Sequence, residues 1–384
     1  MTKVRARHAL VLAVAAALAV PAAGAGSSSH RSSAAKVGAG EGKLTMIAWE
    51  GYLDPKWVKP FEQQSKCKVE AKYAGSSDEM VTLMRSGGGG QYDMVSASGD
   101  ASLRLIYGGD VAAVDVNRVP GWKQFFKGFQ NPPNNTVKGK HYGISLQWGP
   151  NTLMYNAAKV KPAPTSWSAL YDPKFKGKIT VPNNPIQIAD AALYLSKTRP
   201  SLGIKDPYEL NKAQFAATIA LLKKQRPLVK KYWGLSSDEI SLFKNGDATI
   251  GASWPYTTGQ LQAAKVPVKE IIPKEGVTGW LDTWMLSAKA KHPNCAYAWY
   301  SYISSPKVQA LQAVTWGETP VNKQACGFMN KLVKGSCAQY HANEPESYYA
   351  SIKFWKTPLA DCGNGKKDCM DYSQWVKSWN EVIS

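Results

Sequence analysis

Strand-like and helix-like segments alternate early in the chain, and this alternation constrains the fold more than any other feature of the sequence. Lys43–Trp49, Cys67–Tyr73 and Tyr92–Ala97 have the character of strands. Pro55–Phe61 and Ser76–Met84 carry apolar residues at helical spacing, and the second of them begins with a capping-box sequence. The order strand-helix-strand-helix-strand predicts an α/β lobe with a mostly parallel sheet.

The same alternation continues further along the chain. Lys178–Pro182, Ala248–Trp254 and Gly279–Ala288 are strand-like, and helix starts are expected at Asp206–Glu209 and Asn211–Gln214. A chain of 384 residues is long enough for two lobes, each with its own core. We therefore predict an α/β protein of two halves.

The first residues predict export. Residues 1–25 combine a basic start, the apolar run Ala9–Val20 and a small-residue cleavage site at Ala23–Ala25, which is the pattern of a signal peptide. The alternative, a membrane anchor, is disfavoured because the run is short for a bilayer span. No cysteine follows the run closely enough for a lipoprotein anchor. Residues 26–42 read as a flexible leader, and we expect a periplasmic or secreted protein.

Export makes disulfides permissible, and the six cysteines allow fifteen pairings. Two pairs are close in sequence, which leaves one pair distant: Cys326–Cys337, Cys362–Cys369 and Cys67–Cys295. A metal site is disfavoured because the chain has no C-x-x-C motif and its histidines are scattered.

Composition raises the hypothesis of nucleic-acid binding, since the chain has a formal net charge of +19 and contains 14 Trp. The lysines are dispersed, however, and no segment resembles a groove-reading module. We expect a solvated basic surface and no nucleic-acid partner.

For catalysis, neither a G-x-S-x-G nor an H-E-x-x-H motif is present. A secreted hydrolase or polymer-acting enzyme that uses an unrecognised carboxylate or serine site stays open as an alternative.

Aromatic residues stand near the expected strand ends: Trp49, Tyr52, Trp148, Trp254 and Trp280. In open α/β sheets, ligands bind beyond the carboxyl ends of the strands. Core packing is the usual role of any single tryptophan, but several rings at such positions favour a box for a flat or cationic ligand. Asp282, two residues after Trp280, adds a charge partner.

At this point the chain resembles a known family, the solute-binding proteins of ABC transporters for spermidine and putrescine. The resemblance runs from about Lys43 to Asn322 and looks closest to the YdcS-like subgroup. It rests on these pieces: AWEGYLDP (48–55), YDMVSAS (92–98), HYGISLQWGPNTLMYN (141–156), GASWPY (251–256), PKEGVTGWLDT (273–283) and ETPVN (318–322).

The resemblance implies a type II periplasmic-binding-protein fold, in which two α/β lobes joined by hinge strands close on a ligand. The implied first lobe is 43–150 plus 282–320, and the second is 151–281 plus 321–384. The implied function is to bind a polyamine without turnover or cofactor, as a monomer, and to deliver it to an ABC permease. The alternative is another small solute on the same scaffold, such as a sugar, a thiamine-like cation or iron.

The resemblance also implies a site. Trp49 and Tyr52 match the family's first aromatic pair, and Ser98 matches a polar contact. Asp282 matches the carboxylate that meets a ligand amine. Asn184 and Gln187 stand where polyamine binders carry carboxylates. Candidates for the second charge partner are Asp100, Glu318 and Glu50. The expected ligand contacts are Trp49, Tyr52, Ser98, Asp100, Trp148, Asn184, Gln187, Trp254, Trp280, Asp282 and Glu318.

Overall fold

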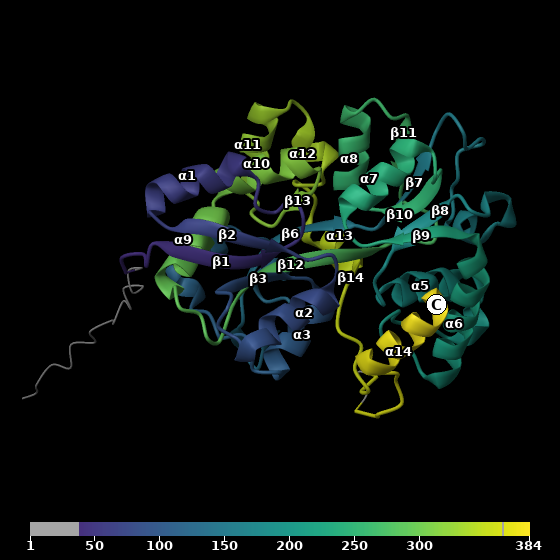
Figure 1. Ribbon diagram of the computed structural model, residues 1–384, viewed down its shortest axis with the longest axis horizontal. Coiled ribbons are helices and arrows are strands. Elements are labelled where there is room, and N and C mark those ends of the chain that lie inside the picture. Colours follow the sequence, from purple (N-terminus) through teal and green to yellow (C-terminus); the bar gives the residue numbers. More distant parts are fainter. Residues whose placement is uncertain (1–37, 363–364) are drawn as a thin grey trace, which may run out of the picture. The chain divides into compact units, whose positions relative to one another are not determined.

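A computed structural model describes residues 38–362 and 365–384. The expected signal peptide and residues 26–37 of the leader lie outside the described residues. Two main sheets, each with helices packed on it, organise the described part of the chain (Figure 1). This is the α/β class that the alternation of segments predicts.

The larger sheet has the strand order β13-β6-β12-β3-β1-β2, and β14 pairs with β12 off this path. β1 is parallel to β2 and β3, whereas β12 is antiparallel to β3 and β6. Its strands are β1 (Lys43–Ala48), β2 (Lys68–Tyr73), β3 (Met94–Ala97), β6 (Ile144–Pro150), β12 (Thr278–Leu286), β13 (Thr319–Pro320) and β14 (Lys353–Phe354).

The smaller sheet has the strand order β11-β7-β10-β8-β9. β8 is parallel to β9 and β10, and β7 runs antiparallel to β10 and β11. Its strands are β7 (Thr152–Asn156), β8 (Ile179–Pro182), β9 (Val229–Trp233), β10 (Ile250–Ser253) and β11 (Val268–Ile271). A separate hairpin is formed by β4 (Thr136–Val137) and β5 (Lys140–His141).

Helices pack against both sheets. In Figure 1, α1 lies above and α2 and α3 lie below the larger sheet, while α7 and α8 lie above and α5 and α6 lie below the smaller one. The helices are α1 (Pro55–Ser65), α2 (Ser77–Arg85), α3 (Gly99–Tyr107), α4 (Lys127–Gln130), α5 (Gln187–Thr198), α6 (Lys212–Gln225), α7 (Ser236–Asn245), α8 (Pro255–Ala263), α9 (Pro293–Ile303), α10 (Pro306–Trp316), α11 (Ala325–Leu332), α12 (Ser336–Gln339), α13 (Glu346–Ser351) and α14 (Tyr372–Ile383).

Local sequence explains where several helices begin. Ser76 accepts a hydrogen bond from the backbone N of Glu79 and so caps α2, as predicted. Asn211 and Gln214 form the predicted capping box of α6. The helix start expected at Asp206–Glu209 is wrong. That segment is a turn in which the Asp206 carboxylate accepts from the backbone N of Tyr208.

Two connections cross between the sheets. β6 runs into β7 through Asn151, and β11 is joined to β12 by residues 272–277. The expected lobe boundaries, which put the second crossing between residues 281 and 282, remain a proposal. β12 begins at Thr278 and pairs with strands of the larger sheet, which supports a second crossing before Thr278. The same pairing supports counting β14 with the larger sheet, whereas α14 packs on α6 of the other half.

The predicted disulfide pairing is confirmed. The bonds are Cys67–Cys295, Cys326–Cys337 and Cys362–Cys369. The first joins segments 228 residues apart and is fully buried next to β2 and α9. Because it closes the longest loop, it constrains the unfolded chain most strongly.

We predict that replacing Cys67 and Cys295 together by Ser destabilises the protein by about 2–5 kcal/mol. The matched control replaces Cys326 and Cys337, whose loop spans only 11 residues, and we expect a smaller loss. Urea unfolding of the oxidised proteins measures both changes. Equal losses would show that loop length does not govern the stabilisation.

Candidate functional site

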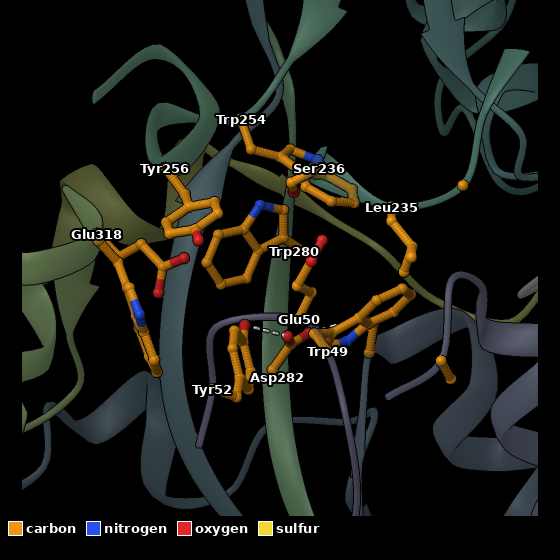
Figure 2. A pocket seen from close by; sticks show the side chains of 14 residues that line it. Trp49, Glu50, Tyr52, Leu235, Ser236, Trp254, Tyr256, Trp280, Asp282 and Glu318 are labelled. Atoms are coloured by element: carbon orange, nitrogen blue, oxygen red, sulfur yellow. Dashed lines mark hydrogen bonds between the residues drawn. The ribbon is translucent and has the colours of Figure 1, made fainter. Parts of the chain in front are cut away.

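A pocket lies where strands of both sheets end. β1 and β3 of the larger sheet and β9 and β10 of the smaller sheet all point their carboxyl ends toward it. This is the edge at which parallel sheets bind ligands. Figure 2 shows the side chains that converge there. The lining residues are Trp49, Glu50, Tyr52, Ala74, Ser98, Gly234, Leu235, Ser236, Trp254, Tyr256, Trp280, Asp282, Trp316 and Glu318.

A tight turn after β1 places two of the predicted aromatic rings. The backbone N of Tyr52 donates to the carbonyl of Trp49 at 3.2 Å. Gly51 between them has φ +95°, a conformation that other residues adopt only with strain. The turn therefore brings both Trp49 and Tyr52 to the pocket wall.

Asp282 lies at the base of the pocket on β12 and is 2% exposed. The hydroxyl of Tyr52 donates to one oxygen of its carboxylate (Figure 2). The hydroxyl of Ser98 donates to the other oxygen. Ser98 precedes α3 but does not cap it, because its hydroxyl is directed at Asp282. Burial raises the pKa of Asp282 to about 7, even though the two hydroxyl donors favour the charged form.

Glu318 is the second buried carboxyl group of the pocket. It follows Gly317, whose φ of +75° turns the chain from α10 into β13. Its Oε2 is buried and has no hydrogen-bond partner among the residues that the structure describes. Burial raises the pKa of Glu318 well above its usual value, and the negative charge of Asp282 raises it further.

Six aromatic rings line the pocket, and four of them pack against a neighbouring ring. Tyr52 stacks on Trp316 with 4.7 Å between the ring centroids. Trp254 packs edge-on against Trp233 at 4.7 Å and meets Trp49 at 6.1 Å. The contact between Trp49 and Trp254 joins the two halves of the chain across the pocket, because one ring follows β1 and the other follows β10.

Glu50 makes a second contact across the pocket. Its Oε2 accepts from the backbone N and the hydroxyl of Ser237, at 3.2 and 3.0 Å. Ser237 lies in the first turn of α7, where the helix dipole favours a negative charge. Glu50 is only partly buried, so it is at the rim of the pocket rather than at its base.

The charge of the lining is opposite to that of the whole chain. Three lining residues are acidic and none is Lys, Arg or His, whereas the chain as a whole has a formal net charge of +19. No group of three or more His, Cys, Asp or Glu side chains in residues 38–362 and 365–384 is arranged to hold a metal ion. Buried acidic groups beside aromatic faces are suited to an organic cation.

Seven of the expected contact residues line this pocket: Trp49, Tyr52, Ser98, Trp254, Trp280, Asp282 and Glu318. Asp100 and Trp148 do not line it. Asp100 is buried behind the pocket, where it accepts from the Ser77 hydroxyl at 2.9 Å. Trp148 is paired in register with Leu281, so it faces the side of the sheet opposite Asp282 and packs in the core.

Asn184 and Gln187 do not line the pocket either. Asn184 accepts from the backbone N of Ile186, and Gln187 donates to Asp190 at 2.9 Å. The pocket thus gives no support to these two as ligand contacts. Six other lining residues were not expected from the sequence: Ala74, Gly234, Leu235, Ser236, Tyr256 and Trp316.

A strand-end rule identifies some of the unexpected residues. Ala74 follows β2 directly, and residues 234–236 follow β9 directly. Tyr256 stands two residues after Trp254, which follows β10 directly. Trp316 ends a helix rather than a strand, and no local pattern marks it. Its place depends on the packing of α10 beside Tyr52 and Trp57.

Among the residues that the structure describes, no helix combines the length and the apolar character needed to cross a membrane.

Comparison with known proteins finds relatives that match most of the chain. The chain is 24% identical over 370 residues to the putrescine/cadaverine-binding protein of Pseudomonas aeruginosa, and the alignment covers 91% of this chain and 96% of that relative. It is likewise 24% identical over 336 residues to the spermidine/putrescine-binding periplasmic protein of Escherichia coli, covering 87% of this chain and 91% of the relative.

A solved structure establishes the fold. The substrate-binding protein PotD of a spermidine/putrescine ABC transporter from Streptococcus pneumoniae superposes with a TM-score of 0.64 at 18% identity, covering 89% of this chain and 97% of that one. The chain therefore has the two-lobe fold of periplasmic binding proteins, as predicted.

The family model described as bacterial extracellular solute-binding protein matches residues 56–326, which is more than half of the chain. The chain therefore belongs to the bacterial extracellular solute-binding proteins.

Proposed function

We propose that this protein binds a polyamine-like organic cation in the pocket and delivers it to an ABC permease outside the cytoplasm. One observation carries the proposal: a chain with a formal net charge of +19 lines the pocket with three acidic residues and no basic one. Relatives named for binding putrescine, cadaverine or spermidine support it. Membership in a solute-binding family favours binding over turnover.

The energetics of the buried carboxyl groups explain why a cation is favoured. Moving an unpaired charge out of water is costly, and a buried carboxyl group therefore holds its proton more tightly. Asp282 and Glu318 both show this raised pKa. A ligand ammonium group supplies the missing positive charge and forms charge-assisted hydrogen bonds with the carboxylates.

The aromatic wall adds to the attraction. A cation over the face of a tryptophan or tyrosine gains about 0.5–2 kcal/mol for each ring. The methylene groups of a polyamine are apolar and pack against the same rings. The acids come from the side of the larger sheet, whereas the smaller sheet contributes Trp254, Tyr256 and Ser236. We therefore expect an ammonium group to point toward Asp282 and Glu318.

The mechanism that we propose is hinge closure. Two chain connections join the sheets, and the contacts Trp49–Trp254 and Glu50–Ser237 span the pocket. Loss of such contacts would open the pocket to solvent, and their formation would bury the ligand. The closed form is then the one that the permease receives. We further propose that the protein acts as a monomer in the periplasm or after secretion.

Calorimetric titration with putrescine and spermidine tests the proposed ligand class. We expect saturable binding of at least one of them with a dissociation constant below about 1 mM, which corresponds to about −4 kcal/mol. Glycerol and a neutral sugar serve as controls without a cation. Absence of heat with both polyamines up to that concentration would refute the polyamine proposal. A ligand that co-purifies would then be identified by native mass spectrometry.

We predict that Asp282→Asn weakens binding of the cation by about 2–4 kcal/mol, because the partner of a buried charge is removed. Glu318→Gln should act in the same direction. The matched control is Asp172→Asn, which removes a carboxylate that pairs with Lys174 away from the pocket. The same titrations measure all three variants. Equal affinity of Asp282→Asn and the native protein would contradict the assignment of this site.

Affinity should also depend on pH. In the free protein Asp282 has a pKa of about 7, and a bound cation favours its ionised form. Lowering the pH from about 8 to about 6 protonates this group and should weaken binding about 10-fold. The amines of the ligand stay protonated throughout, since their pKa resembles that of lysine. Affinities measured across this range check the prediction, and tighter binding at the lower pH would contradict it.

A further inference from the structure

One carboxylate outside the pocket holds the two connections between the sheets together. Asn151 joins β6 to β7, and Thr278 is the first residue of β12. Asp190, on α5, accepts from the side-chain amide of Asn151 at 3.3 Å on each oxygen and from the hydroxyl of Thr278. Asp190 therefore binds both connections at the point where they run side by side.

The two connections are also bonded directly to each other. Asn151 donates through its backbone N to the carbonyl of Thr278 at 2.9 Å and through its amide to the Thr278 hydroxyl at 2.8 Å. Gln187 adds a further neutral donor to Asp190 at 2.9 Å. Asn151 and Thr278 are both buried, so these bonds are shielded from competing water.

The same cluster reaches the wall of the pocket. The indole Nε1 of Trp254 donates to Oδ1 of Asn151 at 3.1 Å. The carboxylate of Asp190 can only accept hydrogen bonds, so the NH2 group of Asn151 must face it. The oxygen of Asn151 is then left to accept from Trp254. The orientation of one amide thus depends on Asp190, and the orientation of a pocket ring depends on that amide.

We infer that Asp190 is a positioning residue for ligand binding. It fixes the amide of Asn151, which holds the ring of Trp254, and it joins the two connections between the sheets to that ring. The inference deepens the proposed function and rests on it for its role in binding. Asp190 itself does not line the pocket.

The chemistry of an amide at position 190 shows what the carboxylate contributes. In Asp190→Asn, an NH2 group replaces an acceptor and faces the donors of Asn151 and Gln187. The amide of Asn151 is then free to rotate and to present its own NH2 to the indole N–H of Trp254. Two donors cannot bond to each other, so the hydrogen bond to the ring is lost.

Hydrogen exchange of the tryptophan indole protons tests this without any ligand. The resonance of Trp254 is assigned from its absence in Trp254→Phe. Measurements are made near pH 8 so that Asp190 is ionised, because burial raises the pKa of Asp190 to about 6. We expect faster exchange of the Trp254 indole proton in Asp190→Asn. The indole of Trp379, which donates to Asn183 at 3.0 Å, is the internal reference and should not change.

Two further variants keep the test decisive. Glu275→Gln is the matched control, since Glu275 is a buried carboxylate that bonds Ser166 and Trp167 rather than Asn151. It should leave the exchange of Trp254 unchanged. If Asp190→Asn does not fold, Asp190→Ser removes the carboxylate with a smaller side chain and should also speed exchange. Unchanged exchange of Trp254 in a folded Asp190→Asn or Asp190→Ser would overturn the inference.

A double-mutant cycle then connects the cluster to binding. We expect Asp190→Asn to weaken putrescine binding about 5-fold when Trp254 is present, the effect of one hydrogen bond, and much less in Trp254→Phe. Equal losses in both backgrounds would show that Asp190 does not act through Trp254. If the native protein binds neither putrescine nor spermidine, the proposed function fails, while the exchange experiment still decides the link from Asp190 to Trp254.

Discussion

The burial of an acidic side chain on β12 is the constraint on which the site depends. Asp282 is almost inaccessible, and the hydroxyls of Tyr52 and Ser98 satisfy its oxygens without supplying a positive charge. Strand alternation places Trp280 and Asp282 on one face of β12 and Leu281 on the other. The same strand begins where one of the two connections between the sheets ends. Asp282 and that connection are therefore parts of one continuous segment.

The charge of the whole protein says little about this site. The chain has a formal net charge of +19, which at first favours an anionic partner. The pocket contains only acidic charges, and its aromatic wall restricts the access of water that would screen them. The specificity that we propose is therefore a local property of a few buried groups.

The sequence predicts the fold and the base of the pocket well. Strand ends mark Trp49 and Trp254, because parallel strands deliver their last residues to one edge of a sheet. Asp282 lies within β12, and the resemblance to the polyamine-binding family marks it. Other positions follow from contacts that local sequence does not encode. Trp148 lies near a strand end, but its register with Leu281 turns it to the opposite face. Trp316 reaches the pocket only through the packing of α10.

Proton release on binding tests the central claim most directly. Titrations near pH 6 in buffers of different ionisation enthalpy measure the protons exchanged when putrescine binds. We predict the release of nearly one proton for each putrescine bound, since Asp282, with a pKa of about 7 in the free protein, must ionise to pair with the ammonium group. Ionisation of Glu318 would add to this release. The release should disappear in Asp282→Asn if Glu318 contributes none. Binding with no proton release, or with proton uptake, would contradict the account.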